Sequence, residues 1–180
     1  TVYGIVTGYA GTTKQDGTSY YEYTVKNNEE EFTLLFTAKQ ADFTGKLVSF
    51  EPVSDNVYSA DDILIFAKPF ADGNYDLADV YVKELNEGDK TLTFFGKVDK
   101  VENSFEGDED SQDTYALDDD CTIVYVNAED EELGRDIGVN AFDSVTGHKN
   151  AAIVTSTDTK GNKVIVAIFV ETSNKVDILK

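Results

Sequence analysis

The fold is decided by two stretches, Tyr115–Val126 (YALDDDCTIVYV) and Lys163–Glu171 (KVIVAIFVE). In both, apolar residues occupy alternate positions and also many of the positions between them. Because successive side chains of a strand point to opposite faces, each stretch would be apolar on both faces. Strands of this kind are covered on both sides, so we expect both stretches at the centre of a sheet or barrel.

Short alternating segments separated by turn-forming residues make up most of the remaining chain. Asp16-Gly17 and Asn86-Glu87-Gly88-Asp89 are typical of hairpin turns. The run Asp118–Asp120 is interpreted in the same way, as a turn that divides the first stretch into two strands. Single helical turns are predicted at Ala38–Phe43 and at Val139–Phe142. The pattern as a whole predicts an all-β fold with short helical turns.

A domain boundary is indicated where turn-forming residues occur without strand periodicity, at Pro69–Asp76. We therefore predict a β-barrel-like module over residues 1–68, a linker over residues 69–78 and a second β module over residues 79–180.

The two modules also show signs of internal duplication. The same offset separates Gly4-x-Val6 from Gly96-x-Val98 and Tyr23-x-Val25 from Tyr115-x-Leu117. Duplication predicts two small antiparallel barrels or sandwiches in tandem, each with five or six strands, and an OB-like barrel is one form that they could take.

The charge balance excludes several classes of partner. The chain has 15 basic and 35 acidic residues, which gives a formal net charge of −20. Such a surface repels phosphate backbones and anionic membranes, so no nucleic acid is expected as a partner. No run approaches the about eighteen apolar residues of a membrane span, so no membrane insertion is expected. With no Met in the chain and no signal peptide before Thr1, we expect a segment of a longer, processed product.

Acidic loops are the first place to look for a ligand. The spacings Asp108-x-Asp110-x-x-Asp113 and Asp72-x-Asn74-x-Asp76 resemble the oxygen-ligand spacing that calcium uses. Neither matches the helix–loop–helix type of site, because the first has no turn glycine and the second has Leu77 in its place. Asp108, Asp110 and Asp113 are therefore candidate ligands of a calcium site built from β loops, and a solvated acidic loop is the alternative. No other cofactor is indicated.

Tyrosines offer a second kind of candidate site. The chain contains no Trp, but a sugar-binding surface could be built from four tyrosines, Tyr9, Tyr20, Tyr58 and Tyr75. Half-buried strand residues are the alternative interpretation of all four.

Catalytic motifs are not found. The sequence has no phosphate-binding glycine-rich loop, no Gly-x-Ser-x-Gly elbow and no His-Glu-x-x-His helix. The single cysteine, Cys121, begins an apolar strand and is interpreted as a small buried side chain, while the single histidine, His148, lies far along the chain. No pair of carboxylates stands out for acid–base chemistry. We therefore expect no enzymatic activity.

A resemblance gives a biological setting. The segment Tyr115–Val126, followed by Lys163–Glu171, resembles the β-rich repeat regions of Gram-positive cell-surface proteins that carry S-layer homology modules. The resemblance implies an extracellular location at the cell surface, with other surface proteins or cell-wall polymers as partners. The S-layer homology module itself is not visible in this sequence. We therefore expect a non-catalytic structural or interaction module, with loop-based glycan or calcium binding as the alternative.

Overall fold

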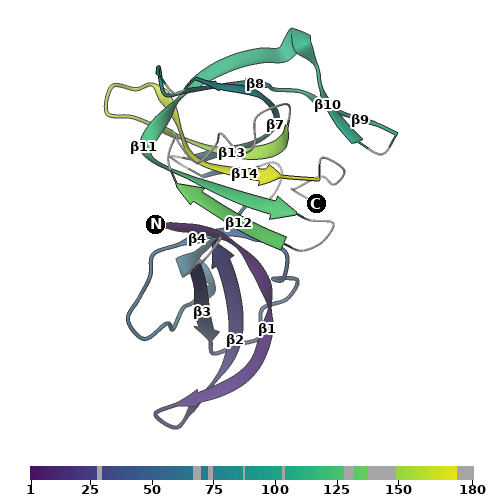
Figure 1. The fold of residues 1–180 in the computed structure, drawn as a ribbon. Helices are drawn as coiled ribbons and strands as arrows, with labels where there is room; N and C mark the ends of the chain where they lie inside the picture. The colour runs from purple at the N-terminus through teal and green to yellow at the C-terminus, as the bar shows by residue number, and fades with distance from the viewer. Residues whose placement is uncertain are drawn as a thin grey trace. The chain divides into compact units, whose positions relative to one another are not determined.

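The computed structural model describes residues 1–27, 30–66, 70–72, 75–86, 88–102, 104–127, 132–137 and 149–173 (Figure 1). For residues 70–72, 75–79, 127, 132–137 and 149 it describes the backbone alone. The chain divides into two compact units, Thr1–Phe66 and Ala67–Lys180. Strands dominate both units, so the predicted all-β class is confirmed.

The first unit is a closed five-stranded barrel. Its strands are β1 (Val2–Gln15), β2 (Thr18–Asn27), β3 (Glu30–Phe36), β4 (Leu47–Phe50) and β5 (Ile63–Phe66). They pair in the order β3-β2-β1-β4-β5, with each pairing antiparallel. A parallel bridge between Leu35 of β3 and Val57, which precedes β5, closes the circuit. This strand order with parallel closure is that of an OB-like barrel.

The second unit contains a barrel of the same topology together with additional strands. The strands are β6 (Phe70–Asp72), β7 (Tyr75–Asn86), β8 (Thr91–Phe95), β9 (Val98–Val101), β10 (Ser104–Gly107), β11 (Gln112–Asn127), β12 (Glu132–Ile137), β13 (Lys149–Thr157) and β14 (Lys163–Glu171). The pairings β7–β8, β8–β11, β11–β14, β14–β13 and β13–β7 form a complete circuit. Within this circuit, only β11 and β14 pair in parallel. Their pairing corresponds to the parallel bridge between β3 and the segment before β5 in the first unit.

The shared topology supports duplication, but the residue correspondence inferred from the sequence is wrong. Topology makes β7 the equivalent of β1, β8 the equivalent of β2 and β11 the equivalent of β3. The sequence offset instead matched Tyr23 of β2 with Tyr115 of β11. Alternating Tyr and Val residues occur in many strands of this chain, so a match between two such strands carries little information about register.

The expected linker is also replaced by paired strands. Within residues 69–78, Phe70 pairs with Leu77, Ala71 with Asp76 and Asp72 with Tyr75. Of the stretch predicted to be a boundary, residues 70–72 therefore belong to β6 and residues 75–76 to β7. The division between the units falls at Phe66 and Ala67, close to the expected end of the first module at residue 68.

The run Asp118–Asp120 does not form a turn between two strands, as the sequence had indicated. It lies inside the continuous strand β11, whose partners on β14 are Ile165 for Leu117 and Ala167 for Thr122. The segment between these two paired positions is longer on β11 than on β14, so β11 forms a β-bulge here. A hydrogen bond from Asp120 N to Asp118 Oδ1 (3.0 Å) stabilises the bulge. Bulges bend a strand, and this one lets β11 curve around its barrel.

Helical turns are short and lie elsewhere than expected. Ala60–Asp62 and Glu109–Ser111 form 3-10 turns, whereas Ala38–Phe43 forms non-helical turns and Val139–Phe142 lies outside the described residues. Within the described part of the chain, no helix has the length and apolar character needed to cross a membrane.

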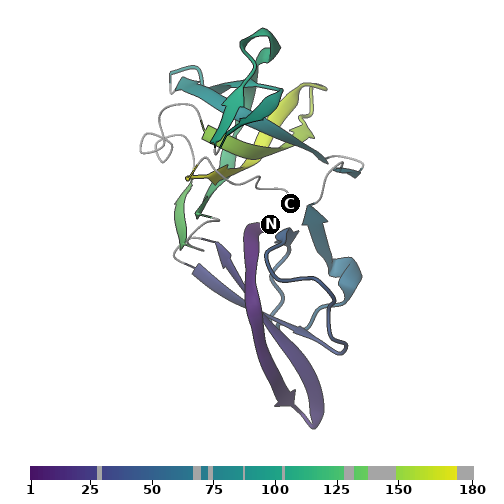
Figure 2. The same cartoon turned by 90° about the vertical axis from the view of Figure 1, so that its right-hand side faces the viewer.

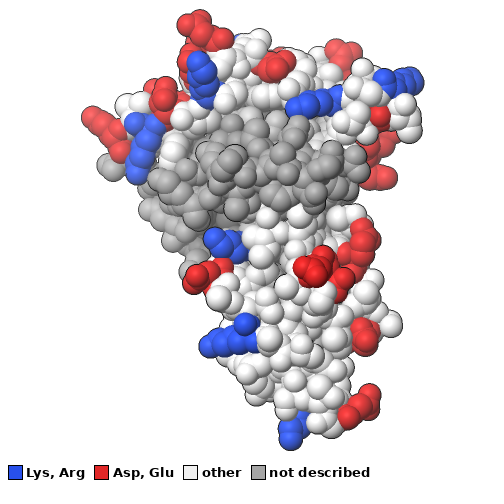
Figure 3. All heavy atoms as spheres, turned by 180° about the vertical axis from the view of Figure 1, so that it is seen from behind, with Lys and Arg blue, Asp and Glu red and all other residues white. Residues whose placement is uncertain are grey.

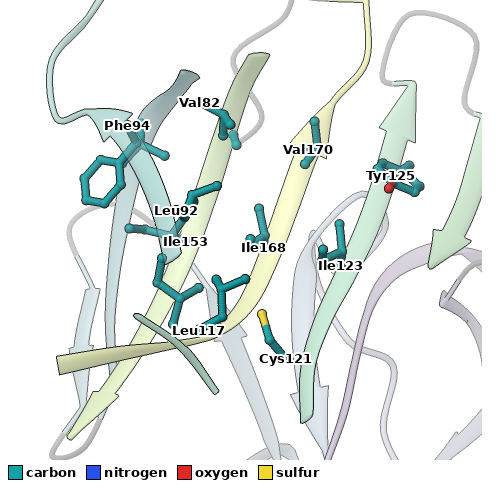
Figure 4. Packing of buried hydrophobic residues seen from close by; sticks show 13 residues of the cluster. Val82, Leu92, Phe94, Leu117, Cys121, Ile123, Tyr125, Ile153, Ile168 and Val170 are labelled. Carbon is teal, nitrogen blue, oxygen red and sulfur yellow. The ribbon is translucent and has the colours of Figure 1, made fainter. Parts of the chain in front are cut away.

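The second barrel has an apolar core to which both opening stretches contribute (Figure 4). Ile123 and Val124 are adjacent in β11 and both are fully buried, as are Ile168 and Phe169 in β14. The prediction that these strands are covered on both faces is therefore confirmed.

Candidate functional site

A hairpin arm extends from the first barrel. Along β1, only Val2–Ile5 pairs with β4. Along β2, Tyr21–Asn27 pairs with β3. Beyond these limits β1 and β2 pair only with each other, as far as Gln15 and Thr18, and both ribbon views show the hairpin running past the end of β3 (Figures 1 and 2). We call residues 8–24 the arm; its base is three-stranded, because residues 21–24 also pair with β3, and residues 13–20 form its two-stranded tip. Its turn is formed by Asp16 and Gly17, both at positive φ, as the sequence indicated.

Bulges bend β1 around Tyr9. The register of β1 against β2 shifts between Val6 and Gly8 and again between Tyr9 and Gly11. A Cβ atom added to Gly8 or to Gly11 would have no neighbour within 4 Å, and Gly11 adopts a φ of +118° that favours glycine. Tyr9 therefore lies in a bent part of β1 between two glycines, and 42% of its surface is exposed.

The exposed ring of Tyr9 is anchored to the barrel core. Its centroid lies 5.3 Å from that of Tyr23 and 6.4 Å from that of Tyr21, with interplanar angles of 48° and 34°. Tyr23 is buried and packs edge-on against Phe36 (5.8 Å) and Phe43 (5.2 Å). A continuous row of aromatic contacts therefore leads from the core to the surface, and it fixes the orientation of Tyr9.

The loop after β3 places a cation beside the same ring. Lys39 Nζ lies 5.1 Å from the centroid of Tyr9, a cation–π distance. The neighbouring Gln40 donates its backbone N–H to Tyr23 Oη (2.9 Å), and the Tyr23 hydroxyl donates to the Gln40 carbonyl (3.1 Å). These bonds hold the loop against the arm. We call Tyr9, Tyr21 and Lys39 the tyrosine platform.

The structure separates the four tyrosines proposed from the sequence. Tyr9 belongs to the platform, whereas Tyr20 is next to Tyr21 in β2 and points to the opposite face of the ribbon. Tyr58 is buried in the core, packs edge-on against Phe50, and accepts a hydrogen bond from Val53 N at its hydroxyl (3.2 Å). Tyr75 lies in β7, and its side chain is outside the description.

Two residues of the platform, Tyr21 and Lys39, were not predicted from the sequence. The signal for Tyr21 was present, because it lies two residues from Tyr23 and therefore shares its face of β2. Lys39 comes from a loop, and only the folded chain brings it to Tyr9.

The three aspartates proposed as calcium ligands are not brought together. Asp108 Oδ1 accepts the backbone N–H of Asp110 (3.0 Å) at the start of a 3-10 turn, and Asp113 Oδ1 accepts the N–H of Thr114 (2.8 Å). In the described ranges, no group of three His, Cys, Asp or Glu side chains is close enough to hold a metal ion. The carboxylates of Asp108 and Asp113 shape the local backbone.

Cys121 is fully buried in the second barrel among Leu117, Ile123 and Ile168 (Figure 4). Burial, together with the negative charge of Asp118, raises the pKa of its thiol to about 12. A thiol with this pKa stays protonated near neutral pH and is a poor nucleophile, so the expected packing role fits the structure. His148 lies outside the described residues.

Charged groups are unevenly spread over the first unit. On the face shown in Figure 3, some of its acidic side chains lie close together on one side, its basic side chains are few, and most of the remaining surface is uncharged. Comparison of the chain with protein-family models, with curated proteins and with solved structures gives no match.

Proposed function

We propose that the chain is a non-catalytic interaction module of a bacterial cell-surface protein, and that the arm of its first barrel binds a cell-wall polymer. The observation that carries this proposal is the tyrosine platform. It combines a rigidly anchored tyrosine ring, 42% of whose surface is exposed, with a second ring and a lysine ammonium group. An anchored aromatic side chain loses little conformational entropy when a ligand packs on it.

The position of the platform on the barrel also supports binding. OB-like barrels present ligands to the region of the second and third strands and to the loop between the first and second strands. In this chain those elements are β2, β3 and the arm.

The described reactive groups support a non-catalytic role. The thiol of Cys121 is buried and protonated. Several exposed aspartates are used as turn acceptors: Asp62 accepts from Ser59 N (2.8 Å) and Asp158 accepts from Asn162 N (2.8 Å). These backbone hydrogen bonds lower the pKa of both carboxyls, so both are ionised and structurally engaged at neutral pH.

Cosedimentation with insoluble cell walls tests the proposal. The full chain is mixed with Gram-positive wall sacculi that retain their attached polymers, and with sacculi from which the polymers have been extracted. We expect the chain to pellet with the polymer-bearing walls, while a globular protein of similar size and charge stays in solution. A chain that remains in the supernatant with both preparations would contradict the proposal.

A further inference from the structure

We infer that the tyrosine platform binds an uncharged saccharide, with a sugar ring stacked on Tyr9 and Tyr21. This inference rests on the proposed function and names the chemical class of its ligand. The C–H face of a pyranose ring is apolar and slightly positive, whereas the face of a phenol ring is electron-rich. Tyr9 and Tyr21 lie 6.4 Å apart with only 34° between their planes, so they offer adjoining ring surfaces on one side of the arm.

Polar groups beside the rings suit the hydroxyl groups of a sugar. The Lys39 ammonium group is held at the Tyr9 ring, where it can donate to a hydroxyl oxygen. Gly8 and Gly11 carry no side chains, and open space lies at both of their Cβ positions. β4 pairs with β1 as far as Ile5, and Gly45 and Lys46 extend these backbone hydrogen bonds to Val6. Among the described residues, no strand pairs with this edge of β1 beyond Val6, so a ligand can approach the arm there.

The charge of the chain selects against acidic saccharides. A formal net charge of −20 repels polyanions at long range, and one lysine at the platform does not reverse that field. An uncharged saccharide experiences no such repulsion, and its recognition depends on stacking and hydrogen bonds alone.

The small size of the platform favours a saccharide over a protein partner. A stable protein interface buries roughly 800 Å² on each partner and has an apolar centre. Among the described residues, the strongly exposed large hydrophobic side chains are Tyr9, Val53, Ile65 and Val101. Of these four side chains, Tyr9 is the one that lies on the arm. The arm therefore offers the ring of Tyr9 and the adjoining ring of Tyr21, and this small area matches one or two sugar units.

The test is a calorimetric titration of the full chain with cellohexaose, chitohexaose and mannohexaose, and with hexagalacturonate as the acidic counterpart. We expect at least one uncharged hexasaccharide to bind and hexagalacturonate to bind at least about tenfold more weakly. Tyr9→Ala and Tyr21→Ala should each weaken the binding about tenfold, while Tyr9→Phe, which keeps the ring, should retain most of it.

Tyr20→Ala is the matched control, because Tyr20 is adjacent to Tyr21 but lies on the other face of the ribbon. It should change the dissociation constant less than about twofold. The inference is overturned when no uncharged hexasaccharide binds, when hexagalacturonate binds best, or when Tyr20→Ala and Tyr21→Ala have equal effects. If the wild type and Tyr9→Ala cosediment equally with walls, this inference fails while the proposed function stands. If the wild type does not cosediment, the proposed function fails.

Discussion

The two barrels each carry an aromatic pair across topologically equivalent strands, but one ring of the first pair is exposed, whereas both rings of the second are covered. In the first unit Tyr9 of β1 pairs with Tyr23 of β2, and 42% of Tyr9 is exposed. In the second unit Tyr81 of β7 pairs with Phe95 of β8, and both are buried. The cover is the β9–β10 hairpin, whose Phe105 packs with Tyr81 and Phe95 in a separate apolar cluster. The hairpin therefore makes this pair part of the structural packing of the second unit.

The face of the strand explains why the second pair needs a cover. Phe94 and Val82 point into the second barrel, so their neighbours Phe95 and Tyr81 point outward. Tyr23, in contrast, points into its barrel and Tyr9 continues the same face along the arm. Lysines lie near rings in both regions, Lys39 at Tyr9 and Lys83 at Phe95 (5.8 Å). The exposure of the ring therefore distinguishes a candidate site from a packed patch.

The largest effect is expected when the covered pair is truncated. Phe95 is 1% exposed, and Phe95→Ala should lower the free energy of unfolding of the second unit by about 3–5 kcal/mol, because it leaves a cavity beneath the hairpin. Pulsed labelling of Cys121 with a thiol reagent in increasing urea reports this unit specifically, because the single cysteine is buried there.

Tyr9→Ala is the counterpart in the pair of the first unit. It should cost the first unit about 1 kcal/mol, since much of the ring already contacts water. Hydrogen exchange measured by mass spectrometry on peptides of residues 1–66 would give this value. Equal losses for the two variants would contradict the distinction between the exposed and the covered ring.

A pair of glycines sharpens the same comparison. A Cβ atom at Gly107 of β10 would lie 2.1 Å from Phe95 Cδ2 and 2.9 Å from Phe95 Cβ. Gly107→Ala should therefore displace the covering hairpin and destabilise the second unit by about 1–3 kcal/mol.

Gly8→Ala is the matched change on the arm, where a Cβ atom would meet nothing within 4 Å. It should alter the stability of the first unit by less than about 0.5 kcal/mol. Urea denaturation followed by circular dichroism and by Cys121 labelling would separate the two effects. A larger loss for Gly8→Ala than for Gly107→Ala would show that the arm, too, is closely covered.

Alkaline pH should weaken the second unit selectively. Burial of Cys121 raises the pKa of its thiol from 9.0 to about 12, so the folded state holds its proton more tightly than the unfolded state. Stability from this group is fully present below about pH 9 and is lost as pH rises toward 12, with a slope of about 1.4 kcal/mol per pH unit. Cys121→Ala removes the group, and its free energy of unfolding should fall less steeply between pH 8 and pH 10. Parallel curves for the two proteins would show that the thiol is not protected.

The sequence predicted those features that depend on local alternation. Adjacent buried residues such as Ile123 and Val124 identified β11 as a central strand, and the Asp16-Gly17 turn was found from its residue types. Both follow from side-chain direction and backbone preference, which operate over a few residues.

Features that depend on long-range pairing were not predictable in the same way. The bulge at Asp118–Asp120 resembles a turn in sequence, and only its pairing with β14 shows that the strand continues. Glu171 ends an apolar strand and is fully buried, accepting a hydrogen bond from Ser173 Oγ (2.7 Å). The platform has the same character, because Tyr9 and Tyr21 meet through strand register and Lys39 arrives from a separate loop.

The smallest effect concerns Lys39, the one platform residue that is not aromatic. An exposed cation–π contact contributes about 0.5–1 kcal/mol, so Lys39→Ala should destabilise the arm by about 0.5 kcal/mol and weaken saccharide binding only about twofold to threefold. Lys14→Ala removes the same charge from an exposed position farther along β1 and should change neither quantity. Lys39→Arg keeps both the charge and the ring contact and should restore binding. Lys14→Ala and Lys39→Ala alter the net charge equally, so a difference between their saccharide affinities measures the contact of Lys39 with Tyr9. Identical affinities would show that the two tyrosine rings alone bind the saccharide.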